Sequence, residues 1–320
     1  MRIVFMGTPD FAVPSLRLLA ESGFEIAAVV TQPDRPKGRK KTLTPPPVKE
    51  AALSLGLPVL QPERMRSPEA VESIRELGPE LIVTAAYGQI LPKAVLDIPR
   101  LGCINVHGSL LPKYRGGAPI QRSIMNGERS TGVTIMYMAE GLDTGDMISV
   151  VELPIGDDDT SGTMFEKLSA AGAKLLGETL PSIVDGTAKA VPQNDDEATY
   201  APNLTRDDER MDWSRSAREL FNQVRGLSPM AGAFTFLSGE VFKVRACEPV
   251  AGKTEAANAA SVRPGTVIDA GTNGILVQAG AGRLLLTEIQ PAGKRAMSAA
   301  EWLKGARLEP GTVFGEGGAI

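Results

Sequence analysis

The chain has 320 residues, of which 42% are hydrophobic and 22% are charged, values typical of a globular protein long enough for two domains. Its formal net charge of −4 argues against indiscriminate binding to nucleic acid. One histidine and two cysteines would leave a transition-metal site to be built almost wholly from carboxylates, so we expect no metal.

The sequence also predicts where the protein works. No run approaches about 18 uninterrupted apolar residues, so we expect no membrane-spanning helix and no membrane partner. The N-terminal MRIVFMG enters a strand-like run at once, which leaves no room for a signal peptide. Cys103 and Cys247 lie far apart in apolar surroundings and are interpreted as reduced, buried thiols. We therefore expect a cytoplasmic protein, and a monomer.

The first part of the chain alternates Val- and Ile-rich runs with helical patterns. Strands are expected at 2–7, 26–32, 58–62, 80–88 and 102–108, and helices at 13–22, 47–56 and 68–78. Further along, we expect a helix within 116–128, two strands about a loop at 139–146, and a long helix at 161–186. This alternation predicts an α/β fold with a Rossmann-like, open, mostly parallel sheet and helices on both faces.

The last part of the chain differs in pattern. A helix is expected within 212–227, followed by short β-like runs at 233–237, 240–248, 265–269, 274–279 and 283–290. Short strands with Gly-rich turns predict a small, OB-like β-barrel. The expected organisation is a catalytic domain at 1–187, a polar, turn-rich linker at 188–206 and a C-terminal barrel domain at 207–320.

A turn after the first expected strand lacks the glycines of a nucleotide site. GTPDF (7–11) stands between a strand and a helix, where phosphate-binding turns occur. It does not match GxGxxG, and no GxxxxGK followed by Ser or Thr is present. We therefore expect no dinucleotide site.

Asn105 and the single histidine, His107, are the first candidates for chemistry. Positions i and i+2 of a strand point to one face, and both residues lie where the strand ends, which is where open parallel sheets bind ligands. A neutral imidazole can take a proton near pH 7, and a carboxamide can donate to an oxygen that becomes negative. The alternative is a core histidine bonded to a backbone carbonyl.

A carboxylate could orient that imidazole. AEGLDTGD (139–146) offers Asp143 and Asp146 in a loop between two expected strands, and Gly141 and Gly145 would let the backbone approach a ligand closely. Because Asp and Gly are also the commonest turn residues, an ordinary turn is an equally good interpretation.

Residues 34–49, DRPKGRKKTLTPPPVK, are strongly basic. They contain six Lys or Arg and one acidic residue. Several prolines predict an irregular, exposed loop, whose cations could follow a phosphate backbone. A solvated surface loop is the alternative.

Taken together, these residues resemble the 10-formyltetrahydrofolate-dependent formyltransferase family. Its signature is an Asn-x-His at a strand end, then Ser-Leu-Leu-Pro-x-Tyr-Arg-Gly, then an Asp in a Gly-rich loop. Here these are Asn105, His107, SLLPKYRG (109–116) and Asp143. GTPDFA, TQPDRPKGR, PPPVK and AYGQILP also resemble segments of those members that act on initiator methionyl-tRNA. The resemblance covers essentially the whole chain.

The resemblance implies a reaction and its residues. The formyl group of 10-formyltetrahydrofolate, a co-substrate, would pass to the α-amine of methionine on initiator methionyl-tRNA for translation initiation. The implied catalytic residues are Asn105, which holds the formyl oxygen, His107 as base or proton shuttle, and Asp143 as its orienting partner. The implied folate-binding residues are Gly88, Gln89, Ile90, Leu91, Ser109, Leu110, Pro112, Ala139, Glu140 and Gly141.

The same resemblance implies contacts with tRNA. The basic loop would wedge into the acceptor end, and the C-terminal domain would grip the stem from the other side. The candidates are Arg35, Lys37, Arg39, Lys40, Lys41, Lys243 and Arg245. For the last two, ordinary surface charge is the alternative.

Three other functions stay open on the sequence. A formyltransferase acting on a small amine would keep Asn105, His107 and Asp143 but would need no basic loop. A hydrolase that releases formate from the same folate would use water in place of the amine. A non-catalytic RNA-binding protein would explain the loop but would leave the Asn-x-His and Asp without a purpose.

Overall fold

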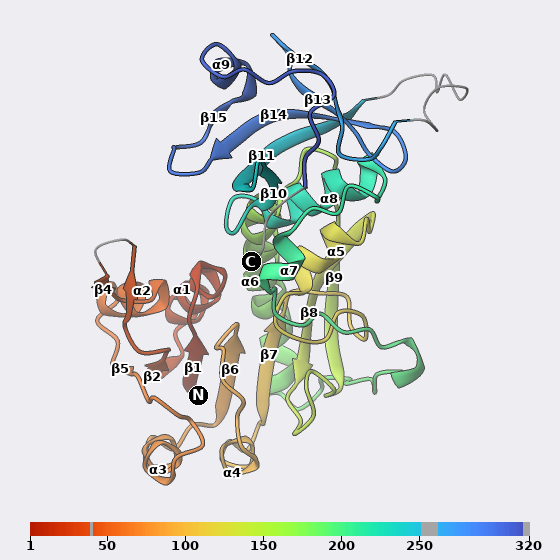
Figure 1. Cartoon of the computed structure of the whole chain (residues 1–320). Helices are drawn as coiled ribbons and strands as arrows, with labels where there is room; N and C mark the ends of the chain where they lie inside the picture. Colours follow the sequence, from red (N-terminus) through yellow and green to blue (C-terminus); the bar gives the residue numbers. More distant parts are fainter. Residues whose placement is uncertain (39–40, 251–261, 316–320) are drawn as a thin grey trace. The chain divides into compact units, whose positions relative to one another are not determined.

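The computed structural model describes residues 1–38, 41–250 and 262–315 (Figure 1). The chain forms two compact units. The N-terminal unit contains Met1–Pro119, Ser130–Pro154 and Phe165–Pro202, and the C-terminal unit contains Ile120–Arg129, Ile155–Met164 and Asn203–Ile320.

A seven-stranded sheet forms the centre of the N-terminal unit. Its strands are β1 (Arg2–Gly7), β2 (Glu25–Val30), β5 (Val59–Leu60), β6 (Leu81–Ala85), β7 (Cys103–His107), β8 (Ser130–Tyr137) and β9 (Met147–Pro154). Their order is β5-β2-β1-β6-β7-β8-β9. The five strands from β5 to β7 in this order pair in parallel, whereas β8 pairs antiparallel with both of its neighbours, β7 and β9. The predicted α/β class with a Rossmann-like, mostly parallel sheet is confirmed.

Helices cover both faces of this sheet. They are α1 (Val13–Glu21), α2 (Pro47–Ser54), α3 (Pro68–Glu76), α4 (Lys93–Leu96) and α6 (Ser161–Val184). Three of them, α1, α2 and α3, have a proline in the first two helical positions, where the missing N–H costs no hydrogen bond. Among the described helices, none has the length and apolarity needed to cross a membrane.

Alternation along β7 decides which side chains face which helices. Val106 faces α6, where a Cβ on Gly172 would lie 2.9 Å from its Cγ1, so a glycine is needed for this close packing. Cys103 points the other way, into an apolar cluster with Val71 and Ile74 of α3 and Val95 of α4. Figure 1 shows α3 and α4 side by side below the sheet. Asn105 and His107 share the parity of Cys103.

The basic segment is more regular than predicted. β3 (Arg35–Lys37) and β4 (Thr42–Thr44) pair as a short antiparallel hairpin, so the expectation of an irregular loop was wrong for these residues. A two-stranded hairpin tolerates Pro36 because an edge strand needs ladder hydrogen bonds on one side only. At its base, Lys49 Nζ lies 2.8 Å from both Asp34 carboxylate oxygens.

The C-terminal unit is built on an antiparallel sheet. Its strands are β10 (Ala233–Leu237), β11 (Glu240–Val250), β12 (Val267–Gly271), β13 (Gly274–Gln278), β14 (Arg283–Pro291) and β15 (Met297–Ser298), and its helices include α5 (Pro119–Met125), α7 (Arg206–Glu209), α8 (Ala217–Leu227) and α9 (Ala299–Leu303). The order is β10-β11-β14-β13-β12, with β15 beside β14. Within the described residues no pairing joins β10 to β12, so the sheet is antiparallel but not closed.

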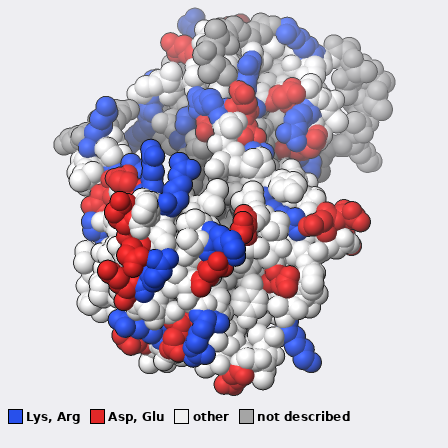
Figure 2. All heavy atoms as spheres, turned by 90° about the horizontal axis from the view of Figure 1, so that it is seen from below, with Lys and Arg blue, Asp and Glu red and all other residues white. Residues whose placement is uncertain are grey.

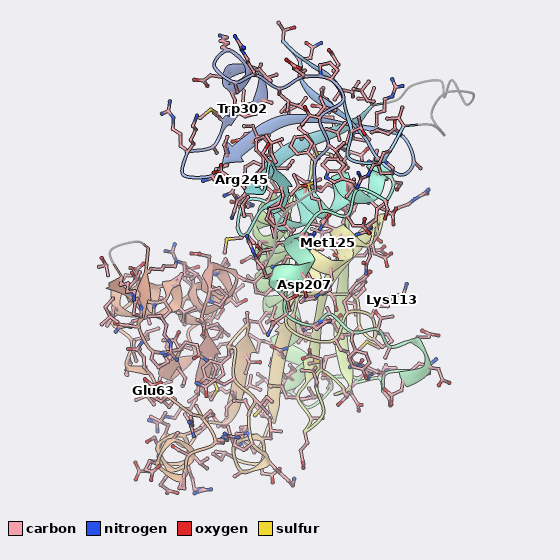
Figure 3. The ribbon with its side chains drawn as sticks, viewed as in Figure 1. Glu63, Lys113, Met125, Asp207, Arg245 and Trp302 are labelled. Carbon is pink, nitrogen blue, oxygen red and sulfur yellow. The ribbon has the colours of Figure 1, made fainter. Side chains whose placement is uncertain are left out.

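Aromatic side chains and one amphipathic helix fill the core of this unit. A capping box between Ser216 and Glu219 starts α8, whose apolar face packs on the sheet. Trp302, labelled in Figure 3, packs edge-on against Phe242 with ring centroids 5.3 Å apart. The ring centroid of Phe242 lies 5.4 Å from that of Phe314.

Candidate active site

His107 lies at the carboxyl end of β7 and is nearly enclosed. Its side chain is 6% exposed. The ring Nε2 is 3.1 Å from the Tyr114 carbonyl oxygen, and since a carbonyl only accepts, Nε2 carries the hydrogen. In the neutral ring the lone pair is therefore on Nδ1, which lies 3.7 Å from Asp143 Oδ2. A proton taken up at Nδ1 would face a carboxylate.

Asp143 reaches this position from the loop between β8 and β9. Its backbone is left-handed, with φ of 50°. Its Oδ2 accepts a hydrogen bond of 2.8 Å from the Gly116 backbone N–H. The other candidate of this loop, Asp146, has its main-chain oxygen bonded to Tyr137 N–H at 2.9 Å. Asp143 is thus the carboxylate that the fold brings to the imidazole.

The two glycines of that loop differ in what surrounds them. A Cβ on Gly145 would lie 1.7 Å from the Tyr137 carbonyl oxygen, and one on Gly141 would lie 2.4 Å from Thr144 Oγ1. The contact at Gly145 is with backbone and excludes any side chain, whether or not a ligand is bound. The contact at Gly141 is with the end of a side chain, which could move. Packing of the loop therefore explains Gly145 without a close approach of ligand to backbone.

Asn105 is held from the neighbouring strand. It lies opposite Thr84 of β6 in the parallel register. The Thr84 hydroxyl, which is buried, contacts Asn105 Oδ1 at 2.8 Å and the Ile104 carbonyl at 3.0 Å. With its oxygen toward Thr84, the carboxamide presents its Nδ2 as the donor for a ligand.

The expected folate loops lie close to each other and expose apolar side chains. Ile90 is 81% exposed and Leu142, in the neighbouring loop, is 57% exposed. A hydrogen bond with the Asp97 carboxylate raises the pKa of the Lys93 ammonium, and Glu140 adds to the effect, so a charge of the second loop interacts with the start of α4, which follows the first loop. Large aliphatic side chains in water are unfavourable, which makes both suitable to contact a flat ligand.

Other predicted folate residues have structural partners. The Gln89 amide accepts from Met65 N–H at 2.7 Å and donates to the Pro62 carbonyl at 3.1 Å, so it anchors a neighbouring loop. The fully buried Ser109 donates to the Lys113 carbonyl at 2.7 Å. The remaining predicted folate residues differ in exposure: Gly88, Ala139 and Gly141 are exposed, Leu110 and Pro112 are half-buried, and Leu91 is buried.

The cations of the basic hairpin differ in their surroundings. Arg35, Lys37 and Lys41 are exposed, and Arg35 lies 3.7 Å from Glu63, which is labelled in Figure 3. Arg39 and Lys40 lie outside the described residues. On the face shown in Figure 2, Lys and Arg are interspersed with Asp and Glu.

Lys243 and Arg245, both predicted to contact tRNA, are bound within the C-terminal unit. Lys243 donates to the Ala231 carbonyl at 2.9 Å, and burial lowers the pKa of its ammonium. Arg245, on β11 (Figure 3), donates to Gln290 Oε1 at 2.6 and 3.1 Å. These contacts hold the turn before β10 and the neighbouring strand β14.

Sequence reasoning missed residues that act through the backbone or from far along the chain. The Tyr114 carbonyl and the Gly116 N–H position the imidazole and its carboxylate, and Thr84 positions Asn105. The resemblance included Tyr114 and Gly116 in its motif but gave them no role. In the part of the chain that the structure describes, no group of three His, Cys, Asp or Glu is placed to hold a metal ion.

Comparisons with known proteins show which family this chain is similar to. The family model described as "Formyl transferase" matches residues 1–180, and "Formyl transferase, C-terminal domain" matches residues 203–307. The methionyl-tRNA formyltransferase of Bacillus velezensis is 57% identical over 316 residues, covering 98% of each chain. That of Bacillus subtilis is 56% identical over 315 residues, again covering 98% of each.

Solved structures share the fold at low identity. HypX from Aquifex aeolicus, in complex with tetrahydrofolic acid, has a TM-score of 0.64 at 19% identity and covers 97% of this chain and 49% of its own. An N-formyltransferase from Helicobacter canadensis, in complex with folinic acid and dTDP-3-aminofucose, has a TM-score of 0.68 at 17% identity, covering 90% and 98%.

Proposed function

Because the chain belongs to the formyl transferase family, we propose that it transfers the formyl group of 10-formyltetrahydrofolate to the α-amine of methionine on initiator methionyl-tRNA, for translation initiation. The resemblance drawn from the sequence is confirmed by relatives of that activity, which match the chain from end to end. The observations that carry the mechanism are that Asn105 and His107 share one face of β7 and that Asp143 Oδ2 lies 3.7 Å from His107 Nδ1.

His107 takes the proton of the attacking amine at Nδ1. The other ring nitrogen is committed to the Tyr114 carbonyl, so Nδ1 is the basic atom. Protonation gives an imidazolium whose two N–H groups face the Tyr114 oxygen and the Asp143 carboxylate.

Asn105 stabilises the charge that develops on the formyl oxygen. As the amine nitrogen bonds to the formyl carbon, the carbonyl π electrons move onto that oxygen, and the Asn105 Nδ2 donates to it. Collapse of the tetrahedral intermediate re-forms the carbonyl and breaks the bond from carbon to N10. The proton held on His107 passes to N10, so the imidazole returns to its neutral form.

The folate co-substrate is proposed to lie against the loops at 88–91 and 139–142. The exposed side chains of Ile90 and Leu142 support this, because covering both would remove apolar surface from water. Backbone groups of Gly88 and Gly141 would supply the hydrogen bonds of the pterin. Ser109, Leu110 and Pro112 would form the wall nearest His107.

The acceptor tRNA is proposed to contact the basic hairpin and the C-terminal domain. Arg35, Lys37 and Lys41 are exposed, as phosphate contacts require, and the proposal extends to Arg39 and Lys40. Lys243 and Arg245 are also proposed to bind tRNA. To do so, each would have to share its hydrogen bonds within the C-terminal unit with a phosphate, or lose them.

The remaining proposals concern organisation. Residues 1–187 are proposed as the catalytic domain, 188–206 as its linker and 207–320 as the tRNA-binding domain. The compact units differ from these bounds, because 120–129 and 155–164 belong to the C-terminal unit and the N-terminal unit extends to Pro202. The bent strand β11, which pairs with both β10 and β14 and has two register shifts, supports an OB-like barrel. The enzyme is proposed to act as a cytoplasmic monomer.

One experiment separates this function from its rivals. Formyl transfer from 10-formyltetrahydrofolate is measured with methionyl-initiator tRNA, with a small amine, and without acceptor. We expect product only with the charged tRNA, at a rate that falls as salt rises. A faster reaction with the small amine would indicate a small-molecule formyltransferase, and formate release without acceptor would indicate a hydrolase.

A further inference from the structure

Part of the segment predicted to be a linker, residues 193–201, lies along the loop that follows β7. Ala201 N–H donates to the Arg115 carbonyl at 2.7 Å, and Arg115 N–H donates to the Thr199 carbonyl at 2.9 Å. Tyr114 N–H donates to Thr199 Oγ1 at 2.9 Å. The backbone that presents the Tyr114 carbonyl to His107 is therefore supported by a segment far away in the sequence.

Gln193 of the same segment contacts the loop that carries Asp143. Its side-chain Nε2 donates to the Asp143 carbonyl at 2.8 Å and to the Gly145 carbonyl at 2.7 Å. Both amide hydrogens are thus used on one turn, at the point where Asp143 has a left-handed backbone. Asp143 is held twice, by its carboxylate through Gly116 and by its main chain through Gln193.

Arg115 determines which way the Gln193 amide points. Its Nε and Nη2 donate to Gln193 Oε1 at 3.0 and 2.9 Å, and the arginine is 2% exposed. A reversed amide would place its NH₂ against the guanidinium and its oxygen against the two carbonyls, so that all four of these partly buried hydrogen bonds are lost. Nη2 also contacts Asp195, an exposed carboxylate, at 2.7 Å.

We propose that Gln193 is a positioning residue for formyl transfer: it fixes the turn that places the Asp143 carboxylate beside His107, and Arg115 fixes Gln193. The inference rests on the function proposed above. Loss of the two Nε2 hydrogen bonds lets the turn relax and Asp143 move from Nδ1. A displacement of about 1 Å in such a site lowers the rate by about 100-fold.

The test uses three substitutions at Gln193 in the full chain. Gln193→Ala removes the amide, and Gln193→Met keeps the length of the side chain without polar atoms. Gln193→Glu keeps the shape but replaces the donor by an acceptor that repels both carbonyls. Asn194→Ala is the matched control, because the adjacent Asn194 is exposed and bonds only within its own turn.

Two readouts are taken. The first is kcat and KM of formyl transfer, for which we expect kcat to fall about 10- to 100-fold in the Gln193 variants, with both KM values within about twofold. The second is the ¹H–¹⁵N spectrum of the imidazole in the free protein. His107 is the single histidine of the chain, so its signals need no assignment. They are expected to shift in each Gln193 variant and to stay in place in Asn194→Ala.

Each outcome of these measurements either supports or contradicts the positioning role of Gln193. Imidazole signals and kcat that match those of the unsubstituted protein in any folded Gln193 variant overturn the proposal, and so does an equal shift in Asn194→Ala. If Gln193→Ala does not fold, the Met and Glu variants give the answer. An unsubstituted protein that fails to formylate methionyl-tRNA contradicts the proposed function instead, while the spectra still report whether Gln193 positions Asp143.

Discussion

The Gly116 backbone N–H donates to Asp143 Oδ2 at 2.8 Å, a bond that joins the loop after β7 to the loop between β8 and β9. Gly116 has a φ of 123°, a conformation that strongly favours glycine. A Cβ at this position would also lie 2.7 Å from the Ala201 carbonyl oxygen. The glycine is therefore required twice, by its backbone conformation and by the segment packed against it.

Gly116→Ala should consequently reduce both activity and stability. The strain and the contact with Ala201 should move the Gly116 N–H away from Asp143, at a cost of about 1–3 kcal/mol in folding free energy. We expect kcat/KM to fall about 10- to 100-fold. Gly56→Ala is the control: Gly56 has a φ of 69° with nothing within 4 Å of its added Cβ. An equal loss in both variants would mean that general strain, not the bond to Asp143, is responsible.

His107→Ala should remove the base. We expect kcat to fall by about 100- to 10,000-fold, the usual contribution of a general base, while tRNA binding and the circular dichroism spectrum stay nearly unchanged. Steady-state kinetics and a filter-binding assay measure the two effects. Retained activity in this variant would rule out the mechanism, because the chain offers no second histidine.

Thr84→Val should affect the reaction through Asn105. Valine matches the shape of threonine but cannot donate to Asn105 Oδ1. The carboxamide can then rotate, and its Nδ2 is no longer held in position to donate to the formyl oxygen. We expect kcat to fall about tenfold or more, with the folate KM little changed. Thr84→Ser keeps the hydroxyl and should recover most of the rate. If serine were as slow as valine, packing rather than the hydrogen bond would be the cause.

Much of the N-terminal fold could be predicted because its central strands β1 and β6 are almost fully buried. Runs such as RIVFMG and ELIVTAAYG have no alternative to the interior of a sheet, and they form β1 and β6. The hairpin β3–β4 was missed because its prolines and cations do not show the alternation of apolar and polar residues that indicates a strand. The predicted barrel depended on strand spacing alone, which located five of the six described strands but does not determine whether the sheet closes.

The candidate site also contains residues that the sequence could predict and residues that it could not. Asn105 and His107 share a face because a strand has a period of two, and this is a local property. The choice of Asp143 over Asp146 came from the family resemblance, since both lie in one Gly-rich loop. Gln193 carried no signal, because a polar residue in a turn-rich segment has no periodicity and its partners lie 48 and 50 positions away.

The cysteines should be inert in the folded protein. Cys103 and Cys247 are both free and buried. Burial raises the pKa of Cys103 to about 12 and also raises that of Cys247. A thiol with a pKa near 12 is ionised in roughly one molecule in ten thousand at pH 8, and only the thiolate reacts. We expect no titratable thiol with an aromatic disulfide reagent at pH 8 and two after denaturation. Rapid labelling of the folded enzyme would contradict this.

The basic hairpin should make the reaction depend on salt. Lys37 and Lys41 are exposed cations on β3 and in the turn that follows it. Each phosphate contact releases condensed counterions, so the logarithm of tRNA affinity falls with the logarithm of salt by about 0.7–0.9 per contact. Replacing both lysines by alanine should lower this slope by about 1.4–1.8 and leave kcat at saturating tRNA nearly unchanged. Lys174→Ala, at an exposed lysine of α6 paired with Glu178, is the matched control and should not alter the slope. An unchanged slope in the double variant would place the tRNA contacts elsewhere on the protein.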